Sequence, residues 1–241
     1  MNVTGTTILI TGGSQGLGRH LAVHFAPKAA EVIVTARNEA GLEQTAAMVA
    51  QAGGRCAYYV SDLRKPDTLE ALVAQIHEQK KRVDLLINNA ADVTSKPLLE
   101  TSSDEIDNLI RTNVTGCLQL CRLLAPGMIQ QGGGMIVNIS SLAGYKPNPT
   151  QTVYSISKGG VNALSDALRA ELSGKGIHVM NVALASVAVE GAPKPGQIPA
   201  ARFAARLERA IERNETELFS SPFTKWLMRL YRFLPPLARL T

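Results

Sequence analysis

Long apolar runs are absent from this 241-residue sequence, which has nothing close to the roughly 18 apolar residues needed to cross a bilayer. An integral membrane protein is therefore excluded. Cys56, Cys117 and Cys121 are too few and too unpatterned for a disulfide framework or a zinc cage, and they predict a reducing, cytoplasmic compartment. The four histidines match no ligand spacing, so we expect no metal site. Apolar residues at 45% and charged residues at 19% exclude the collagen-like and disordered classes.

Acidic residues are absent from residues 222–241. The chain has a formal net charge of +5, and Lys225, Arg229, Arg232 and Arg239 place most of it in this segment. The rest of the chain is close to neutral. A protein that reads nucleic acid normally has a wider basic footprint, so we expect no nucleic-acid partner.

Short β-branched runs alternate with segments of helical spacing up to about residue 185. A parallel pair of strands needs a crossover connection, so this alternation predicts one doubly wound Rossmann-type α/β domain, with a mostly parallel sheet and helices on both faces. The predicted strands are Thr6–Thr11, Glu31–Thr35, Arg55–Val60, Val83–Asn88, Gly134–Ser140 and Ile177–Ala183. The predicted helices are Leu17–Lys28, Asn38–Ala52, Pro66–Lys80, Ser102–Gln131 and Thr152–Ser173.

The alternation weakens after residue 185. A loop rich in Gly, Pro and Ala, Val187–Pro199, precedes a predicted helix at Ala200–Arg213 and a short strand at Glu217–Ser220. A last helix is expected after Pro222, ending at the pair Pro235-Pro236, because a proline ring blocks continuation. We expect 1–241 to form a single domain, with 222–241 as a basic amphipathic C-terminal helix and tail.

This C-terminal segment has an aromatic-rich apolar face and a cationic face. Two roles fit that pattern: contact with a membrane interface, or packing on the protein body or in a dimer interface. The sequence leaves both open. The apolar face is formed by Phe223, Trp226, Leu227, Leu230, Phe233 and Leu234.

A glycine-rich turn joins the first predicted strand to the first predicted helix. Backbone N–H groups in such a turn approach phosphate closely, and the helix N-terminus adds a partial positive charge. The position of this turn in an alternating α/β chain predicts a dinucleotide site at the carboxyl ends of the strands. The turn contains Gly12, Ser14, Gln15, Gly16, Leu17 and Gly18.

The tip of the second predicted strand determines which cofactor is expected. An acidic residue there would favour NAD, but the sequence reads Ala36-Arg37-Asn38. A guanidinium suits a 2′-phosphate through charge-assisted bonds, so we predict NADP(H). The alternative is that Arg37 is only a solvated residue at the start of a helix.

Five motifs in register carry a resemblance to a known family. They are Gly12-x-x-x-Gly16-x-Gly18, Asn88-Asn89-Ala90-Ala91, Thr112-Asn113-Val114-Thr115-Gly116, Ser140-Ser141 and Tyr154-Ser155-Ile156-Ser157-Lys158. Together they resemble the short-chain dehydrogenase/reductase family over about residues 5–185. The resemblance implies the Rossmann fold, a homodimer or homotetramer formed through the helices after the fourth and fifth strands, and hydride transfer with a nicotinamide cofactor.

Tyr154 and Lys158 lie four residues apart, so on a helix they share one face. A tyrosine with a pKa of about 10 exchanges protons poorly near neutrality, and lowering that pKa by about three units needs roughly 4 kcal/mol. One ammonium at about 4 Å in an effective dielectric of about 20 supplies energy of that order. We therefore expect Lys158 to lower the pKa of Tyr154 for general acid/base catalysis.

The resemblance implies further roles. Tyr154 would exchange the proton with the substrate oxygen, and Ser141, with Ser140 as the alternative, would contact that oxygen. Asn113 would support a water relay to Lys158, which would also hold the nicotinamide ribose. The implied cofactor contacts also include Asp62 at the adenine, Leu63 beside it, and Asn89, Ala90 and Val187.

One segment departs from the family pattern. A Pro-Gly pair and a later threonine are expected after the sixth strand, but the chain has Leu184-Ala185, and Val189 takes the place of the hydroxyl residue. The sequence predicts a reductase of a ketone, or a dehydrogenase of an alcohol, with a hydrophobic, lipid-like substrate. The altered segment motivates the alternative of a cofactor-binding regulatory or scaffold protein with little turnover. A lyase or isomerase that uses the same tyrosine is a third reading.

Overall fold

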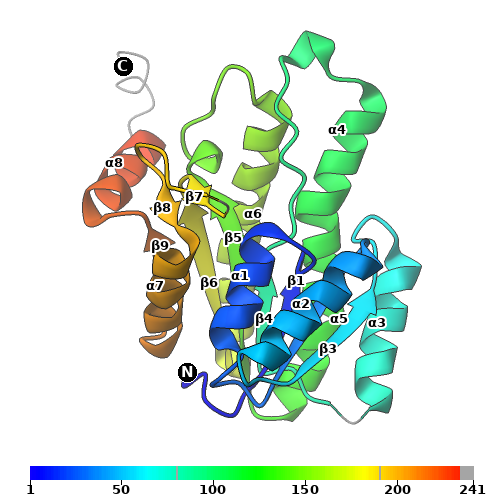
Figure 1. The fold of residues 1–241 in the computed structure, drawn as a ribbon. Coiled ribbons are helices and arrows are strands. Elements are labelled where there is room, and N and C mark those ends of the chain that lie inside the picture. The colour runs from blue at the N-terminus through cyan, green and yellow to red at the C-terminus, as the bar shows by residue number, and fades with distance from the viewer. Residues whose placement is uncertain (80, 190, 234–241) are drawn as a thin grey trace.

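A seven-stranded sheet forms the centre of the molecule (Figure 1). The computed structural model describes residues 1–79, 81–189 and 191–233. The strands are β1 (Thr7–Thr11), β2 (Glu31–Ala36), β3 (Cys56–Val60), β4 (Leu85–Asn88), β5 (Gly134–Ser141), β6 (Ile177–Leu184) and β9 (Glu217–Phe219). Their order is β3-β2-β1-β4-β5-β6-β9, and every neighbouring pair is parallel. The predicted doubly wound α/β fold is confirmed.

Helices cover both faces of this sheet. One face carries α1 (Gly16–Phe25), α2 (Glu39–Gln51) and α7 (Ala200–Glu212), and the other carries α3 (Pro66–Glu78), α5 (Gly116–Gln130) and α6 (Thr152–Leu172). The remaining helices are α4 (Ser103–Ile110), which packs on α6, and α8 (Pro222–Phe233).

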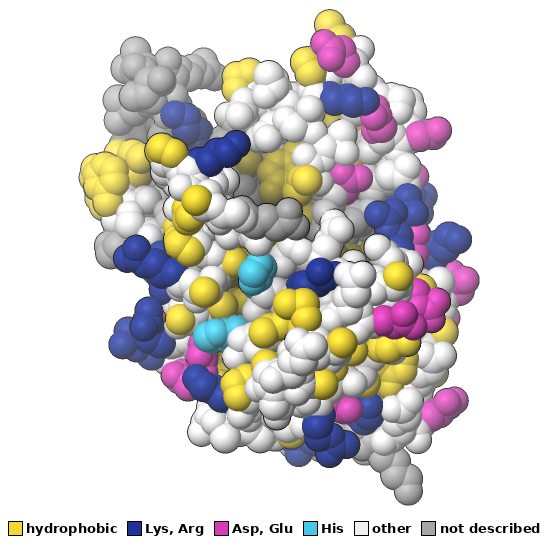
Figure 2. Space-filling model, in the orientation of Figure 1, with side chains coloured by type: hydrophobic (Ala, Val, Ile, Leu, Met, Phe, Trp, Pro, Cys, Tyr) yellow, Lys and Arg dark blue, Asp and Glu magenta, His cyan; other side chains and the backbone are white. Residues whose placement is uncertain are grey.

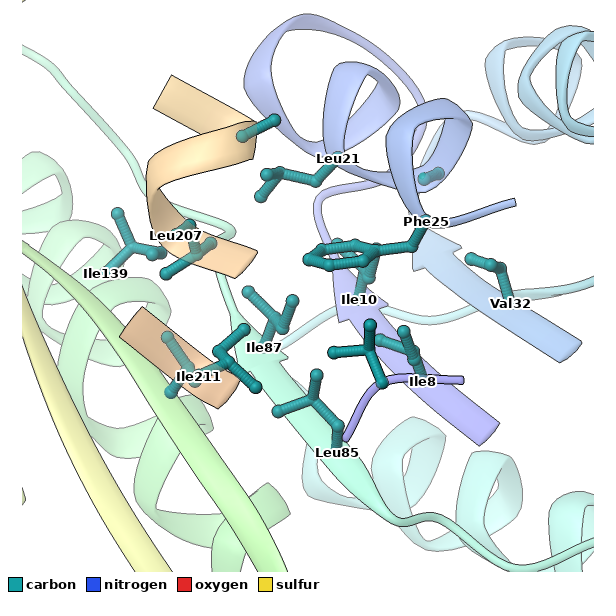
Figure 3. Close-up of a cluster of buried hydrophobic side chains, with 14 of the residues drawn as sticks. Ile8, Ile10, Leu21, Phe25, Val32, Leu85, Ile87, Ile139, Leu207 and Ile211 are labelled. Carbon is teal, nitrogen blue, oxygen red and sulfur yellow. The ribbon is translucent and has the colours of Figure 1, made fainter. Parts of the chain in front are cut away.

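The apolar runs in the strands follow from this double cover, since successive side chains of a strand point to opposite faces. Ile8 and Ile10 of β1 enter the cluster beneath α1 and α7, whereas Leu9 enters the cluster on the other face. Figure 3 shows the first cluster, in which Phe25 and Leu207 meet the strand side chains. Strand register is therefore determined by burial on both sides of the sheet.

One predicted helix is divided in the structure. The segment expected as one helix at Ser102–Gln131 is α4, a π-helical turn at Arg111–Thr115, and α5. The other predicted elements up to β6 exist, with ends that differ by a few residues. A π-turn takes one additional residue per turn, which changes which side chains face inward and is often found at functional sites.

The C-terminal part follows the expected order of loop, helix, strand and helix. Within the loop, β7 (Val187–Ala188) pairs in parallel with β8 (Ile198–Pro199). Helix α8 packs Met228 against Ala183 and Phe219, with Leu142 and Tyr145 at the edge of this small cluster. The predicted helix end at Pro235-Pro236 and the tail 234–241 lie outside the described residues.

Candidate active site

The glycine-rich turn needs glycine for both conformation and space. Gly12 and Gly16 have φ angles of +69° and +55°, in the left-handed region that favours glycine. A Cβ on Gly18 would lie 2.3 Å from the carbonyl oxygen of Gly12, so no side chain fits there. The N–H group of Gly12 donates to Thr35 O at 2.8 Å, which ties the turn to β2. The turn is thus a close-packed cradle of backbone at the carboxyl end of β1.

Arg19 fixes this turn to α2. Its guanidinium donates to the carbonyl oxygens of Ser14 and Gly41, and its Nε donates to Thr45 Oγ1 at 3.0 Å. Ser14 is buried, whereas Gln15 at the turn's outer edge is exposed. Arg19 is not among the predicted site residues, because an arginine in a first helical turn has no distinctive sequence pattern.

The residues predicted for the adenosine half of a nucleotide follow the ends of β2 and β3. Arg37 is exposed, and the Asn38 side chain accepts from Gly41 N at 3.1 Å to cap α2. Arg64 forms an ion pair with Asp62, in which Arg64 Nη2 lies 2.6 Å from Asp62 Oδ2. This hydrogen bond, opposed by partial burial, lowers the pKa of Asp62, and the charge of Arg37 contributes to the lowering. Arg64 is a further residue that the motifs did not single out.

Two asparagine side chains, the half-buried Asn89 and the buried Asn113, hold the backbone around the carboxyl end of β4 in place. Asn89 Nδ2 donates to Thr11 O at 2.9 Å, and the Asn89 and Ala90 N–H groups both donate to Thr11 Oγ1 at 3.0 Å. Asn113 lies in the π-turn, where its side chain bonds both backbone groups of Asp92. Gly116 packs against Leu63: a Cβ on Gly116 would lie 2.4 Å from the carbonyl oxygen of Leu63.

Tyr154 lies beside both of its predicted partners. Its hydroxyl is hydrogen-bonded with the Ser141 side chain, and Lys158 Nζ lies 5.8 Å from the centroid of its ring. Ser141 Oγ accepts from Ala143 N, which leaves the hydroxyl proton free to donate. Ser140, the alternative, donates to the backbone oxygen of Lys158 and is buried. The structure therefore brings Ser141, and not Ser140, to the phenol.

The predicted effect of Lys158 on Tyr154 is wrong for this structure. Burial raises the pKa of Tyr154 above 10, and the bond with Ser141 only partly offsets that rise. Lys158 is itself buried and donates to Ile139 O at 2.8 Å, and burial lowers its pKa to about 8. The ammonium lies over the ring face rather than beside the phenol oxygen, so desolvation is the larger effect.

The altered segment after β6 has a defined structure. Val187 pairs with Ile198 in the short β7–β8 ladder, and its side chain packs against the cluster under α1. The Ser186 hydroxyl accepts from Gln197 Nε2 at 3.0 Å. The carboxyl ends of β1, β4, β5 and β6 share one edge of the parallel sheet, so this segment and the glycine-rich turn lie at the edge where folds of this class bind ligands in a crevice.

The described residues contain neither a cluster of metal-ligating side chains nor a membrane-spanning helix. Residues 1–79, 81–189 and 191–233 contain no group of three or more His, Cys, Asp or Glu side chains that could hold a metal ion. No helix in that part of the chain combines the length and apolar character of a membrane span.

Comparisons with known proteins agree with the fold. A family model described as short chain dehydrogenase matches residues 6–195. The chain is 36% identical over 239 residues to the ketoacyl reductase HetN of Nostoc sp., covering 95% of this chain and 83% of that protein. A short-chain dehydrogenase from Sphingobium yanoikuyae in complex with NADPH has a TM-score of 0.84 at 27% identity, covering 97% and 95%. A metagenomic short-chain oxidoreductase in complex with NADP has a TM-score of 0.81 at 29% identity, covering 91% and 98%.

Proposed function

This chain belongs to the short-chain dehydrogenase family, and we propose that it is an NADP(H)-dependent reductase. The proposed reaction transfers hydride between the nicotinamide and a carbonyl or hydroxyl group of a hydrophobic, lipid-like substrate. One observation carries the proposal: Ser141 and Lys158 both adjoin Tyr154 at the carboxyl edge of the sheet. The similarity to a ketoacyl reductase supports a carbonyl substrate.

The residues at this edge fit a nicotinamide dinucleotide. Glycine at positions 12 and 18 lets the backbone of the turn pack closely, and nothing lies within 4 Å of a Cβ built on Gly16, so phosphates could approach the N–H groups of the turn there. Arg37 would contact the 2′-phosphate, which favours NADP(H), and two neighbours of known structure hold NADP or NADPH. When bound, the reduced nicotinamide supplies the hydride. The other proposed contacts are Ser14, Gln15, Gly16, Leu17, Asn38, Asp62, Leu63, Asn89 and Ala90, with Tyr154 and Lys158 at the ribose and the Val187 backbone at the carboxamide.

Tyr154 and Ser141 would handle the substrate oxygen. Because burial raises the pKa of Tyr154, its phenol is neutral at pH 7 and holds the proton that a reduced carbonyl must receive. An alkoxide is far more basic than a phenolate, so transfer from the phenol is downhill. Ser141 can donate a hydrogen bond to the same oxygen, since its own oxygen is already held by Ala143 N. Asn113 would support the lysine through its place in the π-turn.

Two measurements test this proposal. Titration of the protein with NADPH and NADH, followed by nucleotide fluorescence, should show tighter NADPH binding, and tighter NADH binding contradicts the role of Arg37. Oxidation of NADPH by ketones and 3-oxoacyl thioesters should fall about 10²- to 10⁴-fold in Tyr154→Phe with NADPH affinity retained. Activity that survives the substitution rules out the phenol as the proton donor.

The alternative function is cofactor binding with little turnover. It is motivated by Leu184-Ala185 and Val189, which depart from the family pattern after β6. The same assays separate it from a reductase: NADPH binding without oxidation by any carbonyl compound tested would favour a regulatory or scaffold role.

We also propose a homo-oligomer formed through α5 and α6, as in the family. Support comes from exposed apolar side chains on these helices, Leu118 and Ile129 on α5 and Ile156 on α6. Leu118→Glu should shift the mass measured by light scattering toward the monomer, while Met48→Glu on α2 serves as the control. An unchanged mass for Leu118→Glu contradicts this interface.

We also propose a peripheral membrane contact through the C-terminal segment. Phe223 and Trp226 are 68% and 59% exposed, and their rings stack with centroids 6.2 Å apart. Figure 2 shows this apolar group over α8, with Lys and Arg side chains along α7 below it. Exposed aromatics beside cations are typical of a helix that lies in a membrane interface. Arg202, Arg209 and Arg213 are the exposed arginines of α7 and its end.

Sedimentation with anionic vesicles tests the membrane contact. The full chain should partition more than a chain truncated after Ser221, and Phe223→Ser/Trp226→Ser should reduce partitioning without removing the buried Met228. A matched control removes two exposed apolar side chains outside α8, in Val93→Ser/Leu99→Ser. Equal partitioning of all forms contradicts the proposal.

A further inference from the structure

Three side chains spaced four residues apart along α1 bind the chain that follows β6. His20 Nε2 lies 2.7 Å from Val189 O, and His24 Nε2 lies 2.9 Å from Glu208 Oε2. Lys28 Nζ, just beyond the helix, lies 2.5 Å from Glu208 Oε1. We call this row the α1 seam. Figure 2 shows the two histidines over α1, on the side that faces α7.

The two ends of the α1 seam differ in burial. Glu208 is 6% exposed and receives both His24 and Lys28, so it anchors α7 firmly to α1. Burial raises the pKa of Glu208, but its hydrogen bonds with Lys28 and His24 outweigh that and hold the pKa below its usual value. His20 is exposed, and its hydrogen bond with Val189 lies at the other end of the seam.

His20 connects two walls of the crevice. It stands in the first turns of α1, two residues after Gly18 of the glycine-rich turn. Its partner Val189 follows β7, whose residues Val187 and Ala188 continue from the carboxyl end of β6 and pair with β8. The β8 strand leads directly into α7, which the α1 seam holds at Glu208. Of the three bonds that define the α1 seam, the one from His20 to Val189 O is therefore the one that holds the segment next to the carboxyl end of β6.

We propose that His20 is a positioning residue: by donating to the Val189 carbonyl, it holds the Val187–Val189 segment against the nicotinamide half of the bound cofactor. This inference rests on the proposed NADP(H) function. Position 189 has no side-chain hydroxyl with which to fix the segment. The imidazole of His20, reaching over from α1, takes the place of such an anchor by using the backbone carbonyl of Val189.

A nucleotide fragment separates this role from a general effect on the fold. Affinities for NADPH, NADH and 2′,5′-ADP are measured by titration calorimetry for the wild type, His20→Ala and His20→Gln. The adenosine bisphosphate reaches only the Arg37 side of the crevice. His20→Ala should weaken NADPH and NADH about three- to tenfold, the range expected for one hydrogen bond, and leave 2′,5′-ADP unchanged. His20→Gln keeps a donor and should recover part of the loss. His77→Ala, an exposed histidine of α3, is the matched control.

The outcomes are distinct. Unchanged NADPH affinity in His20→Ala overturns the positioning role, and so does equal weakening of all three nucleotides, because that indicates a disturbed fold. A wild type that binds none of the three nucleotides refutes the proposed function itself, and the role of His20 with it. In kinetics, a positioning effect on bound cofactor should raise the KM for NADPH more than it lowers kcat.

Discussion

Replacing Lys158 with methionine should abolish turnover and yet stabilise the folded protein. Lys158 is 3% exposed, and within residues 1–79, 81–189 and 191–233 no carboxylate forms an ion pair with it. Burial lowers its pKa from 10.5 to about 8. At about 1.4 kcal/mol per pKa unit, the buried charge costs about 3 kcal/mol at neutral pH. The lost bond to Ile139 O offsets about 1 kcal/mol of this.

The net expected gain is about 2 kcal/mol, or about 4–8 °C in Tm for a chain of this length. Between pH 8 and 10.5 the unfolded chain keeps a proton on Lys158 that the folded protein has released, so wild-type stability rises with pH there. The advantage of Lys158→Met should therefore be largest below pH 8 and shrink toward pH 10.

Urea unfolding of both proteins without nucleotide, at pH 7 and pH 9.5, measures this difference. Cys56 and Tyr154 have raised pKa values and also titrate at high pH, but both proteins contain them. The buried Cys117 thiol also has a raised pKa, which the charge of Lys158 lowers, so loss of that charge keeps this thiol neutral in Lys158→Met. A Lys158→Met protein that is less stable than the wild type at pH 7 refutes the reasoning. An advantage of the same size at both pH values does so too.

Three more substitutions probe the frame of the site. Gly18→Ala should abolish NADPH binding in a fluorescence titration, because its Cβ would lie 2.3 Å from Gly12 O; undiminished binding contradicts the close-packed cradle. Asn113→Ala should cost about 2–3 kcal/mol in urea unfolding, since it leaves both backbone groups of Asp92 without their partner; a loss below 1 kcal/mol contradicts this. Glu208→Gln should lower stability at pH 7 and differ less from the wild type as the pH falls below the depressed pKa of Glu208, whereas a difference independent of pH indicates packing alone.

The sequence predicts the order of elements well because burial determines it. Ile8, Leu9 and Ile10 must all be covered, which only a sheet with helices on both faces provides. The grouping of Ser141 with Tyr154 and Lys158 follows from a helix that packs on the preceding strand: Ser141 ends β5, and α6 carries the other two residues on one face. Periodic patterns of apolar residues along the chain therefore predict the order of the helices and strands.

Features that depend on contacts between distant segments escape such patterns. The π-turn at Arg111–Thr115 interrupts a continuous helical periodicity, and its Asn113 bonds Asp92, which lies in a distant segment of the chain. The acidity of Tyr154 depends on depth of burial, which spacing to Lys158 does not give. His20 acquires its role only from Val189, 169 residues later.

Arg19 supports the shape of the glycine-rich turn, whereas Arg37 is the residue proposed to select the nucleotide. Its guanidinium holds the turn against α2 by donating to the carbonyl oxygens of Ser14 and Gly41, while the side chain of Arg37 is exposed to solvent. Under the role proposed for Arg37, substitution at position 37 should change the preference between NADPH and NADH while the glycine-rich turn keeps its structure. Position 19 has no such freedom, and related chains that keep this brace should differ far more at the strand tip than behind the loop.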